Sequence, residues 1–218
     1  MFISFEGLDG SGKTTIIGKV SQKLIKDYPF LNIVSTREPG GKDIKEAEKI
    51  REIILDPNSL LSPVAEALLY TTSRRIHLER VIWPALAKNE VVLCDRYVDS
   101  FYAYQGFARN LGYRFVKDMT HFAIEKTMPD ITIFFEITPE ETLMRRESNR
   151  LIKDRLENEE LDFHHNVYEG YHQIIEEDPN RFVIVDANLT IDQVFDQVYN
   201  QIINHPKFKE YLANLNVK

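Results

Sequence analysis

The opening stretch MFISFEGLDGSGKTT, residues 1–15, predicts a strand, a glycine-rich loop and a helix in immediate succession. Phe2–Phe5 is short, apolar and β-prone, which favours a buried strand over a helix. From Gly7 to Thr14 the chain fits G-x-x-x-x-G-K-[ST], the phosphate-binding pattern that requires this structural context. A chance glycine turn would explain the loop alone, but not the strand before it or the amphipathic helix after it. The stretch therefore predicts a nucleoside triphosphate site.

The chemistry of phosphate binding accounts for the residue types in this loop. Glycine allows backbone N–H groups to curl around phosphate oxygens, and the positive end of the following helix dipole faces the same anion. Lys13 supplies a mobile positive charge, and the Thr14 hydroxyl can ligate Mg²⁺. We expect the triphosphate to bind Gly7, Leu8, Asp9, Gly10, Ser11, Gly12, Lys13, Thr14 and Thr15.

Length and composition narrow the class of protein. The chain has 218 residues, 43% hydrophobic and 28% charged, as expected for a single α/β domain with a substantial core. A net charge of −7 argues against general nucleic-acid binding. The single cysteine, Cys94, excludes an intrachain disulfide and favours a cytoplasmic location. No apolar run approaches membrane-spanning length, so we expect no membrane partner.

Strand-like and helix-like segments alternate along the chain, which predicts a five-stranded parallel sheet with helices on both faces. The expected strands cover residues 2–5, 31–35, 91–95, 130–137 and 182–185. The expected helices cover residues 13–27, 43–55, 62–87 (bent near Pro84), 113–126 and 159–177, and others begin at Pro139 and Thr190. The tail from His205 has no pattern that predicts an element.

Charged and aromatic residues follow the predicted strands, where ligands bind in open α/β sheets. Thr36–Gly41 reads TREPGG, although Pro-Gly-Gly alone would be ordinary turn chemistry. The buried strand Val91–Asp95 ends in an acid suited to Mg²⁺, and the segment Asp99–Arg109 is rich in hydrogen-bonding side chains. On the long helix, Tyr70 and Arg74 share one stripe, which is equally typical of a core aromatic beside a solvated arginine.

Residues 145–155 read RRESNRLIKDR, a basic run in an acidic protein. Such a run is either a solvated helix surface or a lid that covers phosphates. Three classes share the phosphate loop: small-molecule kinases, switch GTPases and motor-like ATPases. The guanine motif N-K-x-D of the GTPases is absent from this sequence, and a motor-like ATPase usually needs a larger chain. Candidate residues for a second, anionic substrate, together with a lid to exclude water, favour a kinase.

From Phe2 to about Val198 the sequence resembles the thymidylate kinases. The resemblance rests on the order and spacing of FEGLDGSGKTT, TREPGG, ALLYTTSRRIHLERVIWPAL, VVLCDRYVDS, AYQG and DRLENEELDFH. It implies the fold of P-loop NTPases and nucleoside monophosphate kinases, as a single kinase domain over residues 1–218. Within it we expect a lid at about 145–158 and a C-terminal tail at 206–218. The expected activity is transfer of the γ-phosphoryl group of ATP to dTMP with Mg²⁺, giving dTDP for dTTP and DNA synthesis, by a homodimer.

The resemblance also implies roles for individual residues. Catalytic roles fall on Asp9, Lys13, Arg96, Arg150 and Arg155. The dTMP-binding residues are expected to be Glu38, Arg51, Tyr70, Arg74, Arg96, Ser100, Tyr104 and Gln105. Mg²⁺ is expected at Thr14 and Asp95. Independently of the resemblance, the loop at residues 186–188 is a candidate for the adenine contacts, which the sequence marks poorly.

Two positions depart from common family patterns. Tyr70 stands where phenylalanine is common, so the ring can still stack on thymine but its hydroxyl needs a partner. Gly10 stands where one branch carries an arginine, so the transition-state cation must come from the lid, as in the bacterial-type branch. Among Arg145, Arg146, Arg150 and Arg155 we favour Arg150, then Arg155. The alternatives are a kinase for another acceptor and a non-catalytic ATP-binding protein.

Overall fold

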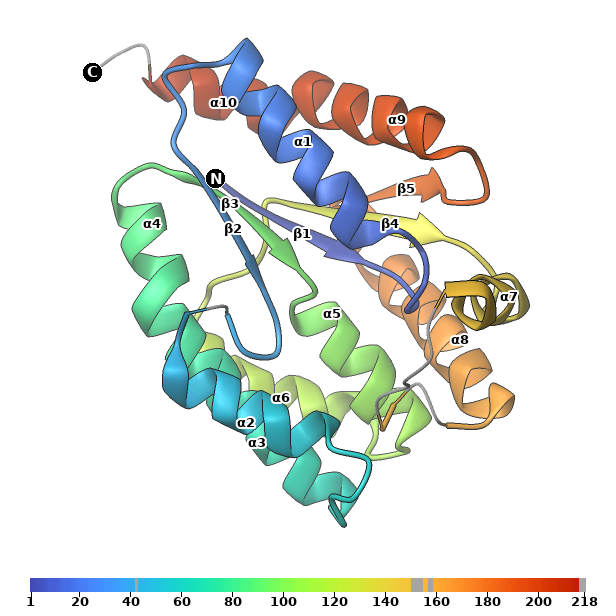
Figure 1. The fold of residues 1–218 in the computed structure, drawn as a ribbon. Coiled ribbons are helices and arrows are strands. Elements are labelled where there is room, and N and C mark those ends of the chain that lie inside the picture. Colours follow the sequence, from blue (N-terminus) through green and yellow to red (C-terminus); the bar gives the residue numbers. More distant parts are fainter. Residues whose placement is uncertain (42, 150–154, 157–158, 216–218) are drawn as a thin grey trace.

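A computed structural model describes residues 1–218 except 42, 150–154, 157–158 and 216–218. Within the described residues, five strands form one parallel sheet in the order β2-β3-β1-β4-β5 (Figure 1). This confirms the predicted sheet. The strands are β1 (Phe2–Glu6), β2 (Ile33–Arg37), β3 (Val91–Asp95), β4 (Ile131–Glu136) and β5 (Phe182–Asp186).

The register brings the carboxyl ends of the three strands on one side of the sheet to the same level. Asp95 pairs with Phe5 of β1 and with Arg37 of β2. The loops that leave β1, β2 and β3 therefore start side by side. This edge of the sheet is where the predicted phosphate loop, the TREPGG turn and the acid of β3 meet.

One face of the sheet is covered by α1 (Lys13–Asp27), α9 (Ile191–Asn204) and α10 (Pro206–Leu215) (Figure 1). Side chains that alternate along β1 reach this core, as Ile3 and Phe5 do, and α1 adds Val20 and Leu24 at helical spacing. The helix α10 is new relative to the sequence prediction. Its Phe208 is fully buried and meets Tyr28 edge-on at 5.7 Å between ring centroids.

The other face is covered by a larger group of helices. The core there includes Phe2, Cys94 and Phe134, on the strand faces opposite to those of the first core, and Tyr171 from a helix that covers them. The helices are α2 (Lys45–Leu55), α3 (Pro63–His77), α4 (Trp83–Ala87), α5 (Val98–Phe101), α6 (Tyr113–Ile124) and α8 (Leu161–Glu177), with α7 (Pro139–Asn149) packed against α8. None of the described helices is long and apolar enough to cross a membrane.

Two π-helical segments interrupt this helical layer. The first, Leu78–Ile82, joins α3 to α4, so the predicted long helix is continuous but widens just before Pro84. Pro84 lacks an N–H group and its ring conflicts with a regular helix turn, which explains the wider turn there. The second, Tyr102–Ala108, continues α5 and places Tyr104 and Gln105 at the edge of the sheet.

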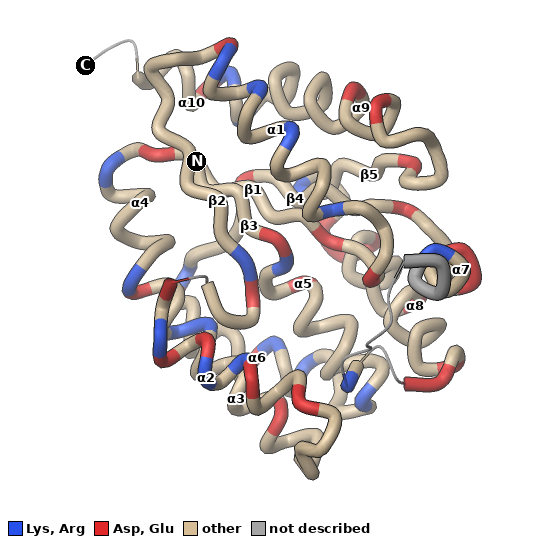
Figure 2. The backbone as a smooth tube through the Cα atoms, in the orientation of Figure 1, with Lys and Arg blue, Asp and Glu red and all other residues tan. Residues whose placement is uncertain are grey.

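Side chains cap the N-termini of three of the described helices. The Ser62 hydroxyl accepts from the Ala65 N–H. Thr138 with Glu141, and Thr190 with Gln193, form reciprocal capping boxes at the starts of α7 and α9. Figure 2 shows that basic and acidic residues are interspersed along the helices. Residues of both charges lie near the ends of β2 and β3.

Candidate active site

A cavity of about 940 Å³ lies at the carboxyl ends of β1, β2 and β3. Its lining comes from the phosphate loop, the turn after β2, the helices α2 and α3, the segment after β3, and the start of α9. It includes Asp9, Gly10, Gly12 to Thr15, Ser35 to Pro39, Arg51, Tyr70, Arg74, Asp95 to Tyr97, Ser100, Tyr104, Gln105, Arg145 and Leu189 to Ile191. The cavity thus gathers residues from segments far apart in the sequence.

The phosphate loop, Gly7–Thr14, has the backbone conformation that its glycines predict. Gly7 has φ of 137°, and a Cβ there would lie 2.9 Å from the Phe135 carbonyl oxygen, so only glycine fits. Gly10 and Gly12 are also left-handed. The buried Lys13 ammonium donates to the carbonyl oxygens of Gly7, at 3.0 Å, and Leu8, at 2.8 Å. The pKa of Lys13 is lowered to about 8, mainly by burial and secondly by the nearby positive charge of Arg96.

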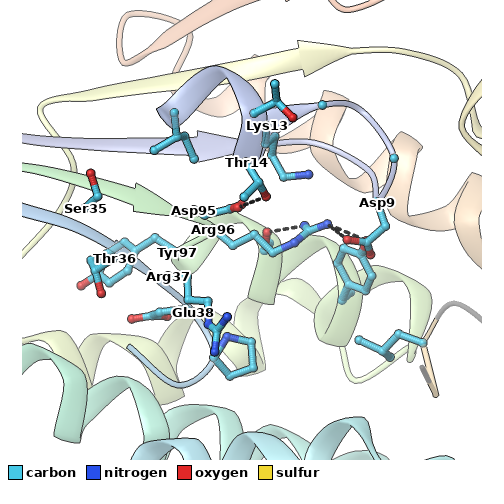
Figure 3. A pocket seen from close by; sticks show the side chains of 18 of the residues that line it. Asp9, Lys13, Thr14, Ser35, Thr36, Arg37, Glu38, Asp95, Arg96 and Tyr97 are labelled. Carbon is cyan, nitrogen blue, oxygen red and sulfur yellow. Dashed lines mark hydrogen bonds and ion pairs between the residues drawn. The ribbon is translucent and has the colours of Figure 1, made fainter. Parts of the chain in front are cut away.

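Thr14, the second residue of α1, meets the last residue of β3. Its hydroxyl donates to Asp95 Oδ2 at 2.6 Å (Figure 3). Hydroxyl and carboxylate oxygens are ligands that Mg²⁺ prefers. The two residues predicted to bind the metal are therefore in contact, at the end of the phosphate loop.

Arg96 crosses the middle of the cavity towards the phosphate loop. It is a non-glycine residue with φ of 69°, a conformation that costs about 1–3 kcal/mol and is concentrated at functional sites. One guanidinium nitrogen donates to Asp9 Oδ1 at 2.8 Å and the other to Ser100 Oγ at 2.8 Å (Figure 3). The guanidinium also lies 5.2 Å from the centroid of the Tyr104 ring. Four predicted residues thus form one cluster.

The carboxylate of Glu6 supports this cluster from below and was not predicted. It is fully buried and accepts from the Tyr97 N–H at 2.7 Å, Ser100 Oγ at 2.5 Å and Tyr171 Oη at 3.0 Å. Burial, with the nearby charge of Asp99, raises the pKa of Glu6 to about 7. A glutamate at the end of a buried apolar strand was the signal in the sequence, but its partners come from the segment after β3, from α5 and from α8.

The turn after β2 is held by α3. Glu38 is buried and accepts from Arg74 Nε at 2.8 Å, and its other oxygen lies 3.1 Å from His77 Nδ1. The second His77 nitrogen lies 2.7 Å from Thr36 Oγ1. Arg51 of α2 donates to the Pro39 carbonyl at 2.9 Å. Arg74 is thus a buried residue of the cavity, which excludes the reading of a solvated arginine.

Beyond this turn the cavity ends in an aromatic and amide pocket. Tyr70, which lines it, has its ring centroid 6.1 Å from that of Phe101. Gln105 Nε2 donates to Glu66 Oε1 at 2.8 Å. Two buried polar atoms here, Arg74 Nη1 and Gln105 Oε1, have no hydrogen-bond partner among the described residues. The first atom is a hydrogen-bond donor and the second an acceptor. The pocket therefore suits a molecule that presents an acceptor and a donor side by side.

The arginines of the basic run are placed apart. Arg145 lines the cavity and donates to the Ala187 carbonyl at 2.9 Å. Arg155 does not belong to the cavity lining; it pairs with Glu66 at 2.6 Å and donates to the Ile54 carbonyl. Arg150 and the side chain of Arg146 lie outside the described residues. Leu189–Ile191, directly after the segment predicted to hold adenine, also line the cavity.

Comparison with known proteins agrees with this geometry. The family model "Thymidylate kinase" matches residues 5–198. The chain is 55% identical over 214 residues to the thymidylate kinase of Mycoplasmopsis agalactiae, covering 98% of this chain and 100% of that protein. It is 49% identical to the thymidylate kinase of Mycoplasma mobile, covering 92% and 97%.

A crystal structure of thymidylate kinase from Ehrlichia chaffeensis matches with a TM-score of 0.73 at 29% identity, covering 92% of this chain and 96% of that one. The parallel sheet, the phosphate loop and the cavity at its carboxyl edge are therefore accompanied by family-level similarity over nearly the whole chain. The chain belongs to the thymidylate kinase family, ATP-dependent nucleoside monophosphate kinases that phosphorylate dTMP.

Proposed function

We propose that this cavity holds ATP and dTMP end to end and transfers the γ-phosphoryl group between them. The phosphate loop binds the ATP phosphates, and the pocket between Tyr70 and Gln105 binds the thymine base. Arg96 lies between these two ends, where the dTMP phosphate would meet the γ-phosphate. The product is dTDP, a precursor of dTTP.

The unpaired atoms Arg74 Nη1 and Gln105 Oε1 carry this assignment. Thymine presents a carbonyl oxygen at position 4 and an N–H at position 3, which match a buried donor and a buried acceptor. Cytosine presents the reverse pattern, an amino donor at position 4 and an acceptor nitrogen at position 3. It would place a donor against the Arg74 donor and an acceptor against the Gln105 acceptor. The buried Tyr70 ring offers its face to the base.

The residues present also fit a divalent cation. Thr14 Oγ1 and Asp95 Oδ2 supply oxygen ligands next to the phosphate loop, and no cluster of three or more metal-binding side chains occurs among the described residues. This donor set suits Mg²⁺, which keeps several waters and binds through one or two protein oxygens plus phosphates. When bound, Mg²⁺ supplies charge neutralisation at the β- and γ-phosphates.

The protein contributes alignment and positive charge to the reaction. The acceptor is an ionised phosphate, so no general base is required. We assign Lys13 to the transferring phosphate and the Asp9–Arg96 pair to the acceptor phosphate. Glu38, Arg51, Ser100 and Tyr104 complete the dTMP site. Because Gly10 has no side chain, we assign the further cation to the lid, with Arg150 preferred over Arg155.

We further propose a single kinase domain that acts as a cytoplasmic homodimer, with a lid at about 145–158. Apolar side chains on two neighbouring helices support dimerisation. Val64 and Leu68 on α3 are 44% and 53% exposed, and Phe115 and Phe122 on α6 are 47% and 89% exposed. Such exposed apolar residues are typical of protein–protein contacts. The thiol of Cys94 is buried and forms no disulfide, which is compatible with a reducing compartment.

The test is ADP formation measured with dTMP, dUMP, dCMP, thymidine or no acceptor. We expect ADP release to depend on dTMP and to be weak with dCMP. A preference for thymidine or another monophosphate would favour the rival acceptors. ATP binding without dTMP-dependent ADP release would favour a non-catalytic protein.

A further inference from the structure

Glu66 is a buried carboxylate directly behind the base pocket. It lies on α3, one helical turn before Tyr70, and is 1% exposed. One oxygen accepts from Gln105 Nε2 at 2.8 Å. The other lies 2.6 Å from an Arg155 guanidinium nitrogen and 3.5 Å from Arg109 Nε. Donor groups therefore face both oxygens of this carboxylate, an amide NH₂ on one side and two guanidinium groups on the other.

The carboxylate accepts from the Gln105 amide, and this fixes the orientation of that amide. The NH₂ group must face Glu66, so the amide oxygen faces the cavity. The structure has this arrangement, with Gln105 Oε1 buried and without a partner among the described residues. Without Glu66 the two ends of the amide would be nearly equivalent in shape and the group could rotate by half a turn.

We propose that Glu66 is a positioning residue that determines base specificity by holding the Gln105 amide oxygen towards the base. The inference rests on the proposed function, in which that oxygen accepts from the N–H of thymine. If the amide were rotated, the Gln105 NH₂ group would face the thymine N–H. Two donors that face each other cannot form a hydrogen bond, and this disfavours binding. Glu66 therefore acts on the dTMP site through Gln105, without touching the nucleotide.

A purely structural role is the competing explanation, because Glu66 also anchors the chain before α8. Arg155 pairs with Glu66, and Arg109 also pairs with Glu159 at 2.6 Å. If Glu66 served only this anchor, its replacement would act independently of the Gln105 amide. The two roles are therefore separable by a double-mutant cycle.

The experiment measures kcat and KM for dTMP and dCMP in Glu66→Gln, Gln105→Met and the double variant. We expect Glu66→Gln to raise KM for dTMP about tenfold with kcat nearly unchanged, and to lower the dTMP-over-dCMP preference. In the Gln105→Met background, the same substitution is expected to leave both quantities unchanged. Glu52→Gln, an exposed glutamate on α2, is the matched control.

Equal effects of Glu66→Gln with and without the Gln105 amide would overturn the proposal, as would a loss confined to kcat. If Glu66→Gln does not fold, Glu66→Asp keeps the counter-charge for both arginines while withdrawing the carboxylate from Gln105. The same KM rise and the same dependence on Gln105 are then expected. Wild-type enzyme that uses dCMP as readily as dTMP would instead contradict the base assignment of the proposed function.

Discussion

The Thr14 hydroxyl donates a 2.6 Å hydrogen bond to Asp95 Oδ2, joining the first turn of α1 to the end of β3. The two residues are 81 positions apart in the sequence. The parallel register makes the contact possible, because Asp95 lies beside Phe5, two residues before the phosphate loop. The strand pairing of the sheet thus assembles the two oxygen ligands proposed for Mg²⁺.

Asp95→Asn and Thr14→Val are expected to weaken the response to Mg²⁺. Each removes one oxygen ligand or its charge, so the Mg²⁺ concentration for half-maximal activity should rise by about tenfold or more. A Mg²⁺ titration of dTMP-dependent ADP formation measures this. Thr72→Val, an exposed threonine on α3 outside the cavity, is the control. An unchanged Mg²⁺ midpoint in both variants would separate this pair from the metal.

Lys13→Ala is expected to abolish turnover. The buried ammonium lies inside the phosphate loop and is the charge that we assign to the transferring group, and such stabilisation is commonly worth about 100-fold or more in rate. Single-turnover ADP formation measures the loss. Lys26→Ala, an exposed lysine at the other end of α1, should retain wild-type activity. Near-normal activity of Lys13→Ala would remove the loop from the mechanism.

Glu6 is expected to make stability depend on pH. Its pKa is raised from 4.5 to about 7 in the folded protein, so the folded state binds the proton more tightly than the unfolded chain. The stabilisation from this proton is complete below pH 4.5 and is lost as pH rises through 7. The shift corresponds to about 3 kcal/mol.

Glu6→Gln isolates this contribution because glutamine does not titrate. Denaturant unfolding of both proteins between pH 4.5 and 8 measures the difference in free energy of unfolding. We expect wild-type stability to fall relative to Glu6→Gln across this range. A pH-independent difference would mean that Glu6 has an ordinary pKa.

The elements that sequence predicted best are those with a strong local pattern. The helix Lys13–Asp27 and the strand Val91–Asp95 agree with prediction at both ends, since glycine, apolar periodicity and the terminal acid mark their limits. Thr14, Asp95 and Arg96 could be predicted to lie in one site, because ligands bind at the carboxyl ends of parallel strands.

What sequence did not predict depends on contacts between distant segments. The Glu6 cluster needs Tyr171, 165 residues away, and no local pattern marks that pair. The π-helical segment Tyr102–Ala108 packs against α8 and α6, which lie later in the chain, and no local pattern predicts its wider turn. Arg155 could be counted as a lid cation, but its pairing with the buried Glu66 required the fold.

The helix α10 was missed although a signal was present. Phe208, Tyr211, Leu212 and Leu215 have helical spacing, and Pro206 stands at the start. Phe208→Ala is expected to lower the free energy of unfolding by about 3–5 kcal/mol, because the fully buried ring leaves a cavity. Phe30→Ala, at a ring that is 60% exposed, should cost less than about 1 kcal/mol. Equal costs would show that the Phe208 ring does not pack in the core.

Arg150→Ala is expected to lower kcat far more than it weakens dTMP binding. A cation that neutralises charge developing during phosphoryl transfer contributes about 10³-fold or more to kcat, whereas we assign binding of the monophosphate to Arg74, Arg96 and the aromatic pocket of the cavity. Single-turnover rates and equilibrium dTMP binding separate the two effects. Arg155→Ala is the informative comparison, because its guanidinium is paired with Glu66 and should matter less to the chemical step. A parallel loss of rate and affinity in Arg150→Ala would make it a binding residue, and a larger kcat loss in Arg155→Ala would reverse the order of the two.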